Sequence, residues 1–137
     1  MRRSCLSLAG VLVLAECIEP PPVGSVAKDN ACRVQDGKAL SVAPLRAVGT
    51  EPFWGARIEG RCVTYSHIDD QQGSRVLAQF QQVGADMIWS GTLRGQPFEL
   101  RARPMPGCSD GMSDKLYPLA VALKVDGKQR TGCAEPL

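Results

Sequence analysis

The chain of 137 residues contains a single histidine, His67, and only 5% of its residues are aromatic. Any Ser-His-Asp arrangement or Cys/His zinc site would have to use His67, and no two cysteines have Cys-x-x-Cys spacing. There is no Gly-x-Ser-x-Gly motif and no glycine-rich phosphate-binding loop. These absences argue against a hydrolase, a nucleotide-binding enzyme and a zinc protein. We therefore expect a protein that is not an enzyme and carries no cofactor and no metal.

The sequence also lacks an excess of charge of one sign and a long apolar run. Its formal net charge is +2 at pH 7, which leaves no basic footprint for nucleic acid or anionic lipid. No segment after the first sixteen residues approaches the roughly 20 apolar residues of a membrane-spanning helix. We expect no nucleic-acid partner and a soluble domain downstream of the leader.

The amino terminus has the pattern of an export signal. Met1-Arg2-Arg3 is followed by an apolar run from Leu6 to Ala15, which is typical of a secretory signal peptide. The next residues, Leu14-Ala15-Glu16-Cys17, have the shape of a bacterial lipobox, although Glu16 stands where glycine or alanine is usual. We expect a signal peptide over residues 1–16 and lipid attachment, with palmitate among the acyl chains, at Cys17.

Two alternatives for this end remain open: cleavage after Ser25-Val26-Ala27 with simple secretion, and an uncleaved anchor. If Cys17 is lipidated, Ile18 after it favours the outer membrane, on the periplasmic side of a bacterial cell envelope. Pro20-Pro21-Pro22 is typical of a stiff spacer. We therefore assign residues 17–38 to a linker and residues 39–137 to a single domain.

From residue 39 onward, apolar side chains alternate with period two, which indicates half-buried strands. The alternation predicts that one face of each strand packs into a core. The residues expected on that face include Trp54, Ala56, Ile58, Val63, Tyr65, Val76, Ala78, Phe80, Met87, Trp89, Gly91, Leu93, Phe98, Leu100, Ala102, Tyr117, Leu119, Val121, Leu123 and Val125.

Turn signals separate these runs. Asp126-Gly127 is the strongest, because type I′ hairpin turns need positive φ at both central residues. The others are Glu59-Gly60-Arg61, Gln72-Gly73, Gly84-Ala85-Asp86 and Gly95-Gln96-Pro97. Strands joined by such short turns form a meander, which protects its edges by closing into a barrel or folding into a sandwich. The predicted fold is all-β: a small antiparallel meander of about seven or eight strands, stapled by disulfides.

Apart from Cys5 in the signal peptide and the lipid-attachment candidate Cys17, four cysteines remain: Cys32, Cys62, Cys108 and Cys133. An even number in an exported chain indicates two disulfides, for which three connectivities exist. We favour Cys108–Cys133, which brackets a polar turn and a hairpin, together with Cys32–Cys62.

Two segments carry a resemblance to a known family. Gly49-Thr50-Glu51-Pro52-Phe53-Trp54, together with the seven-residue segment from Cys108 to Asp114, Tyr117-Pro118 and Gly132-Cys133, resembles a family of bacterial envelope lipoproteins of unknown function. The resemblance covers about residues 45–134 and implies an envelope location and a small β-barrel-like domain, with no implied activity. A looser likeness to META-domain lipoproteins supports the architecture.

These motifs also contain the candidate binding residues. Phe53 and Trp54 point to opposite faces of a strand, so we expect one in the core and the other exposed, where an aromatic side chain can anchor a partner. Glu51 is expected to accept backbone N–H bonds from a facing turn, and the Cys108–Asp114 segment to bond back to itself. The candidate binding surface consists of Glu51, Phe53, Trp54, Ser109, Asp110, Met112, Asp114 and Tyr117.

The sequence thus favours a non-enzymatic envelope lipoprotein whose β domain binds or stabilises an unknown envelope protein. One alternative is an inhibitor of a lysozyme-type hydrolase, which would insert the Cys108–Asp114 loop into the enzyme. Another is a small-ligand or metal-binding barrel. For the metal, calcium would use Asp110 and Asp114 with Glu51 or Asp69-Asp70, and copper(I) would use Met105, Met112 and His67.

Overall fold

A computed structural model describes residues 30–137 of the chain. The expected signal peptide, the lipid-attachment residue Cys17 and most of the expected spacer lie outside these residues. Within them, no helix has the length and apolar character needed to span a membrane.

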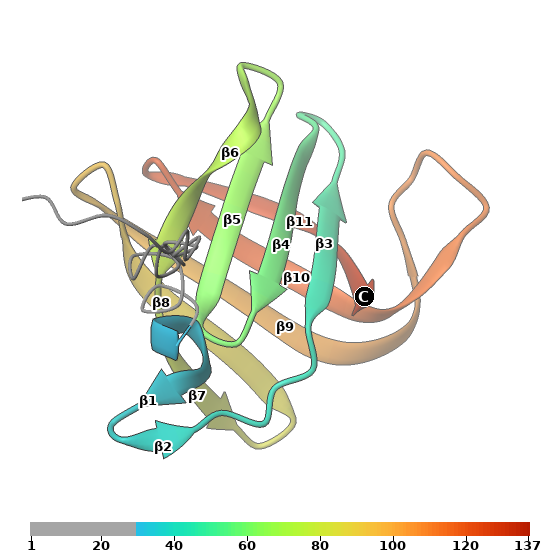
Figure 1. Ribbon diagram of the computed structural model, residues 1–137. Helices are drawn as coiled ribbons and strands as arrows, with labels where there is room; N and C mark the ends of the chain where they lie inside the picture. The colour runs from blue at the N-terminus through green and yellow to red at the C-terminus, as the bar shows by residue number, and fades with distance from the viewer. Residues whose placement is uncertain (1–29) are drawn as a thin grey trace, which may run out of the picture.

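Nine strands form one antiparallel sheet in the order β6-β5-β4-β3-β11-β10-β9-β8-β7 (Figure 1). Most sequence neighbours in this sheet are joined by short turns, as the predicted meander requires. The strands are β3 (Leu45–Gly49), β4 (Trp54–Glu59), β5 (Cys62–His67), β6 (Asp70–Leu77), β7 (Gln79–Val83), β8 (Asp86–Leu93), β9 (Gln96–Ser109), β10 (Leu116–Val125) and β11 (Lys128–Pro136).

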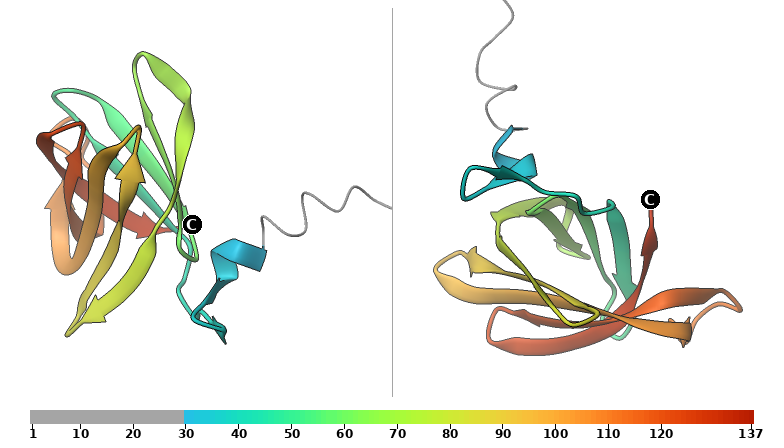
Figure 2. Two further views of the ribbon diagram at one scale, coloured as in Figure 1. Left: turned by 90° about the vertical axis from the view of Figure 1, so that its left-hand side faces the viewer. Right: turned by 90° about the horizontal axis from the view of Figure 1, so that it is seen from below.

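The sheet curls so that its two ends approach each other, and it forms a half-barrel (Figure 2). The outermost strands, β6 and β7, are consecutive in the chain and are separated by Ala78 alone. The Ala78 amide donates to the carbonyl of Arg61 at 2.9 Å, and a Cβ on Gly91 would lie 2.9 Å from Val76 Cγ1. This close approach of β8 to the bend explains why position 91 is a glycine. The predicted all-β, barrel-like fold is therefore confirmed.

The strand count differs slightly from the expected seven or eight. The alternation of Val76, Ala78 and Phe80 predicts one strand, whereas the structure bends this run at Ala78 so that its halves pair with different neighbours. Residues 70–77 pair with β5, and residues 79–83 pair with β8. One bent segment thus supplies both edges of the sheet, which sequence periodicity cannot reveal because the alternation continues through the bend.

The concave face of the half-barrel is filled by side chains. Trp89, Phe98, Ile58, Leu100 and Leu123 are almost completely buried there. These side chains belong to one continuous apolar cluster that contains most of the residues predicted for the inner face. Burying a side chain of this size contributes about 1.5–3 kcal/mol to stability, so this filled interior is the main source of the stability of the fold.

Two turn predictions have different outcomes. Asp126 and Gly127 have φ of 52° and 71° and join β10 to β11, as predicted. Gln72-Gly73 is not a turn, because it lies inside β6, and the chain reverses at residues 68–69 instead. Gly73 has φ of 88°, and a Cβ there would lie 2.8 Å from Thr64 Cγ2. The glycine is needed at an irregular, closely paired position of a strand, and its sequence signature resembles that of a turn.

The amino-terminal part of the described chain packs against the domain. Residues 30–33 form one helical turn, followed by the hairpin of β1 (Val34–Gln35) and β2 (Lys38–Ala39). The Cys32 carbonyl accepts from the Arg61 amide at 2.8 Å, and the Gln35 side chain bonds both backbone groups of Phe80, at 2.7 and 2.8 Å. Cys32 and Gln35, which the sequence assigns to the linker, therefore contact the β domain directly.

Both favoured disulfides are present. Cys32 bonds to Cys62, and Cys108 bonds to Cys133. The first joins the amino-terminal segment to the start of β5, and the second joins β9 to β11 across the intervening β10. Arg75 lies against the first disulfide, with Nη2 close to both sulfur atoms.

Candidate functional site

The two aromatic residues at the end of the β3–β4 turn have opposite environments, as predicted: one is buried and the other is exposed. Trp54, the first residue of β4, is 5% exposed, whereas Phe53 is 57% exposed. Between the two strands, Glu51 has φ of 61° and the Glu51-Pro52 peptide is cis. The turn thus presents the Phe53 ring to solvent while the next residue packs in the core.

Two glycines make the space that Trp54 occupies. A Cβ on Gly49 would lie 1.9 Å from Trp54 Nε1, and a Cβ on Gly132 would lie 2.8 Å from Trp54 Cζ2. The indole N–H donates to the Thr131 carbonyl at 3.3 Å. The indole therefore connects the first resemblance motif to the Gly132-Cys133 motif, although more than seventy residues separate them.

The loop between β9 and β10 is organised around the carboxylate of Asp110. This carboxylate accepts from the backbone N–H groups of Met112 and Ser113, both at 2.9 Å, from Ser113 Oγ at 3.1 Å, and from the Tyr117 hydroxyl at 3.4 Å. The two backbone N–H groups are the main reason why the pKa of Asp110 lies below its ordinary value. Gly111, with φ of 78°, permits the tight turn, and the predicted self-bonded turn is confirmed.

A hydrogen bond joins this loop to the β3–β4 turn. Thr50 Oγ1 donates to the Asp110 carbonyl at 2.7 Å. The expected contact through Glu51 was wrong: Glu51 is exposed, and among residues 30–137 it accepts no hydrogen bond from the loop. Positive φ turns Glu51 away at the corner of the turn, and Thr50 takes its place.

The base of the loop is covalently and sterically fixed. Cys108, Cys133 and Tyr117 form a small buried cluster beside the main core. On the far side of the loop, Lys115 Nζ lies 2.7 Å from Glu135 Oε1 and 5.0 Å from the centre of the Tyr117 ring. Exposed ion pairs contribute little stability, so the disulfide and the buried Tyr117 ring are the stronger restraints.

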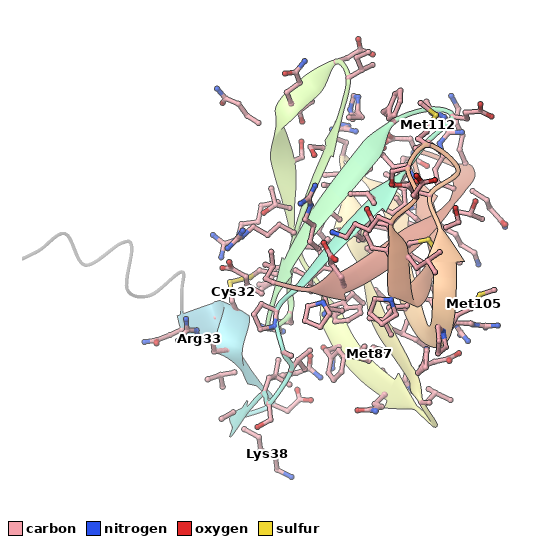
Figure 3. All side chains as sticks on the ribbon, turned by 90° about the vertical axis from the view of Figure 1, so that its right-hand side faces the viewer. Cys32, Arg33, Lys38, Met87, Met105 and Met112 are labelled. Carbon is pink, nitrogen blue, oxygen red and sulfur yellow. A yellow bond between two sulfur atoms is a disulfide. The ribbon has the colours of Figure 1, made fainter. Side chains whose placement is uncertain are left out.

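Two turns and one loop at this end of the molecule each carry an exposed apolar side chain, and two of these side chains, Phe53 and Ile68, line the same cavity. We call this the turn end and define it as the β3–β4 turn (residues 50–53), the β5–β6 turn (residues 68–69) and the β9–β10 loop (residues 110–115). Phe53, Ile68 and Met112 are 57%, 68% and 64% exposed, and Figure 3 shows Met112 at the tip of the β9–β10 loop. Ile68 was missed in the sequence because a lone apolar residue in a polar turn gives no pattern.

A cavity of about 230 Å³ opens at the turn end. Tyr65 and Val125 line it from the strands, Phe53 and Ile68 from the turns, and Arg130 from β11. Burial and the charge of Asp126 raise the pKa of Tyr65, against the opposing charges of Arg130 and Arg94. The sequence could not identify this site, because Tyr65 and Arg130 lie on strands that are far apart in the chain.

The structure does not bring the suggested metal ligands together. Among residues 30–137, no three His, Cys, Asp or Glu side chains are grouped so that they could hold a metal ion. The Asp110 carboxylate is engaged by its own loop, and Figure 3 shows Met105 and Met112 well apart. His67 Nδ1 accepts a hydrogen bond from the Asp69 amide at 3.3 Å.

The chain matches no protein-family model, no curated protein and no solved structure. Of the sequence-derived candidates, the structure brings Trp54, Asp110 and Tyr117 into structural roles. It leaves Phe53, Met112 and Asp114 on the surface. The functional argument therefore depends on what the turn end presents to solvent.

Proposed function

We propose that this protein is a non-enzymatic lipoprotein of the bacterial cell envelope whose β domain binds an envelope protein through the turn end. The observation that supports this most is the pair of exposed apolar side chains of Phe53 and Ile68, which line one cavity together, with Met112 exposed on the β9–β10 loop. Exposed apolar groups that gather on one face of a soluble domain are typical of interaction sites. The β3–β4 turn and the β9–β10 loop are held by the Thr50–Asp110 bond and the Cys108–Cys133 disulfide, so binding through them would cost little ordering entropy.

The position of the amino-terminal segment fits a tethered domain. Cys32 is bonded to Cys62 at the start of β5, whereas Ile68 follows the end of that strand. The chain therefore enters the domain at the end opposite to the turn end (Figure 1). A domain attached through lipidated Cys17 would direct the turn end away from the membrane and toward a partner.

Site-specific photo-cross-linking in living cells tests this proposal. A photoreactive residue at position 53 or 112 of the full chain should give one discrete cross-linked product, and Phe53→Ser should weaken the product formed from position 112. Val34 provides a matched control, because it is an exposed apolar residue at the opposite end. Equal products from positions 34, 53 and 112 would contradict the proposal.

A second candidate is inhibition of a lysozyme-type hydrolase, and the shape of the β9–β10 loop favours it. This loop extends beyond the sheet (Figure 1), and it carries the exposed side chains of Ser113 and Asp114. In an assay of lysozyme with the full chain, Asp114→Ala should abolish inhibition, whereas Asp36→Ala, in the β1–β2 turn, should not. No inhibition at micromolar protein would exclude this candidate.

A further inference from the structure

The cavity at the turn end, which we call the mouth cavity, combines an apolar wall with polar groups at its base. Phe53 and Ile68 stand at its rim, and Val125 belongs to the core cluster beneath it. The interior of the half-barrel below is filled by side chains. A ligand would therefore bind in the mouth itself, and its size would be limited by the volume of about 230 Å³.

Two polar groups of the mouth cavity have no hydrogen-bonding partner within residues 30–137: the Tyr65 hydroxyl and the Arg130 guanidinium. In that part of the chain, every fully enclosed side-chain nitrogen or oxygen has a partner. The Tyr65 hydroxyl, on a side chain that is only 5% exposed, must therefore reach the open space of the cavity. Arg130 is half-buried and has up to five donors to satisfy.

The charges around the cavity favour an anion. Arg94 Nη2 holds both carboxylate oxygens of Asp126, at 3.1 and 3.2 Å, and so balances that negative charge. The other charged side chains of the lining are Lys128, Arg130 and Asp69, which leaves two cations against one carboxylate. His67 Nδ1 accepts the Asp69 N–H, so a neutral imidazole carries its proton on Nε2 and adds a further donor.

We propose that the mouth cavity binds a small ligand in which a carboxylate is joined to an apolar or aromatic group. The carboxylate bonds the Arg130 guanidinium and the Tyr65 hydroxyl, and the apolar group packs against Phe53 and Ile68. Arginine suits this role because its planar fork matches a carboxylate. The volume is below the roughly 300–1,000 Å³ of drug-sized sites, so a ligand with a single ring fits. A free acid and the carboxyl terminus of a peptide both supply this chemistry.

The test uses the purified full chain with both disulfides formed, without any envelope partner, so that its outcome is separate from that of the proposed function. Phenylacetate is titrated while backbone amide resonances are followed by NMR, with neutral phenylacetamide and cationic phenethylamine as matched probes. We expect saturable shifts at residues 65, 67 and 130 with phenylacetate, and binding about tenfold weaker or worse for the other two. N-acetyl-glycyl-phenylalanine distinguishes the sources: tighter binding than phenylacetate indicates a peptide terminus, and weaker binding indicates a free acid.

Substitutions then test which side chains of the mouth cavity contact the ligand. Arg130→Gln and Tyr65→Phe should each weaken phenylacetate binding about tenfold, whereas Arg33→Gln, on an exposed arginine at the opposite end, should not change it. If Arg130→Gln does not fold, Tyr65→Phe decides the question alone, because it removes only the hydroxyl. Absence of saturable shifts at millimolar phenylacetate, equal binding of the three probes, or unchanged binding by Tyr65→Phe would overturn the proposal.

Discussion

The indole of Trp54 lies where a side chain on Gly132 would have to go: a Cβ at position 132 would come within 2.8 Å of Trp54 Cζ2 and 2.1 Å of the Val48 carbonyl oxygen. The indole of Trp54 therefore fits only because position 132, in the final strand β11, has no side chain. The backbone carbonyl of Val48 belongs to the paired neighbouring strand and cannot move freely.

We therefore expect Gly132→Ala to destabilise the fold by about 1–3 kcal/mol, the usual cost of overpacking a core. Gly55→Ala is the matched control, since its Cβ would meet only Ser66 Oγ at 3.3 Å and the Ala47 carbonyl oxygen at 3.8 Å. Urea unfolding followed by tryptophan fluorescence measures both. Equal free energies of unfolding for the two variants would show that Trp54 does not require a glycine at position 132.

The two disulfides should restrain different parts of the molecule. Replacing both Cys108 and Cys133 by alanine should lower the free energy of unfolding by about 2–5 kcal/mol and increase amide hydrogen exchange in residues 109–116. Replacing both Cys32 and Cys62 should have a comparable effect on stability, but should increase exchange in residues 30–40 instead. Hydrogen exchange followed by mass spectrometry separates the two patterns. Increased exchange in the same region for both variants would contradict the assigned roles.

The loop around Asp110 should depend on pH. Because backbone N–H groups of Met112 and Ser113 stabilise its carboxylate, the pKa of Asp110 lies below its ordinary value. A lowered pKa in the folded state means that the stabilisation is complete above the unfolded value of about 3.9 and is lost as the pH falls through the folded value.

An NMR titration of the Asp110 carboxyl carbon measures this pKa directly. In Ser113→Ala the pKa should rise only part of the way toward the ordinary value, because the backbone bonds are the larger cause. Full return to the ordinary value in that variant would show that the serine hydroxyl, and not the backbone, holds the carboxylate.

Replacing Cys17 tests whether this residue is the site of lipid attachment. In cells supplied with labelled palmitate, the wild-type protein should be labelled and Cys17→Ala should not. Cys5→Ala is the matched control, because Cys5 lies inside the expected signal peptide and its replacement should leave labelling unchanged. Labelling that persists in Cys17→Ala would refute attachment at Cys17. No labelling of the wild-type protein would refute the lipoprotein proposal and favour secretion or an uncleaved anchor.

Local patterns were sufficient for several features because these depend on neighbouring residues alone. The alternation in residues 117–125 predicts which side chains face the core, and Asp126-Gly127 predicts a hairpin through its positive φ. Trp54 is buried and Phe53 is exposed, as predicted, although Phe53 lies in the β3–β4 turn and not in a strand. The self-bonded turn at Asp110 follows from its short polar side chains, and all of these predictions are confirmed.

Other features could not be predicted from the sequence, because they depend on contacts between strands that are distant in the chain. Gly73 has the sequence signature of a turn, but it lies in β6, where a side chain would clash with Thr64 of the paired strand β5. Ala78 continues the alternation, yet the chain bends there to reach the other edge of the sheet. Thr50, and not Glu51, reaches the β9–β10 loop, since the path of the turn determines which side chain faces it.

The sequence by itself therefore determined the fold class and the polar turn, because periodicity and turn chemistry act over short distances along the chain, and its cysteines favoured the two disulfides that form. The tertiary structure decided how the sheet curls, why Gly132 has no side chain, and that Tyr65 and Arg130 share one cavity. These depend on which strands become neighbours, and that choice is made by burial of the whole apolar face at once.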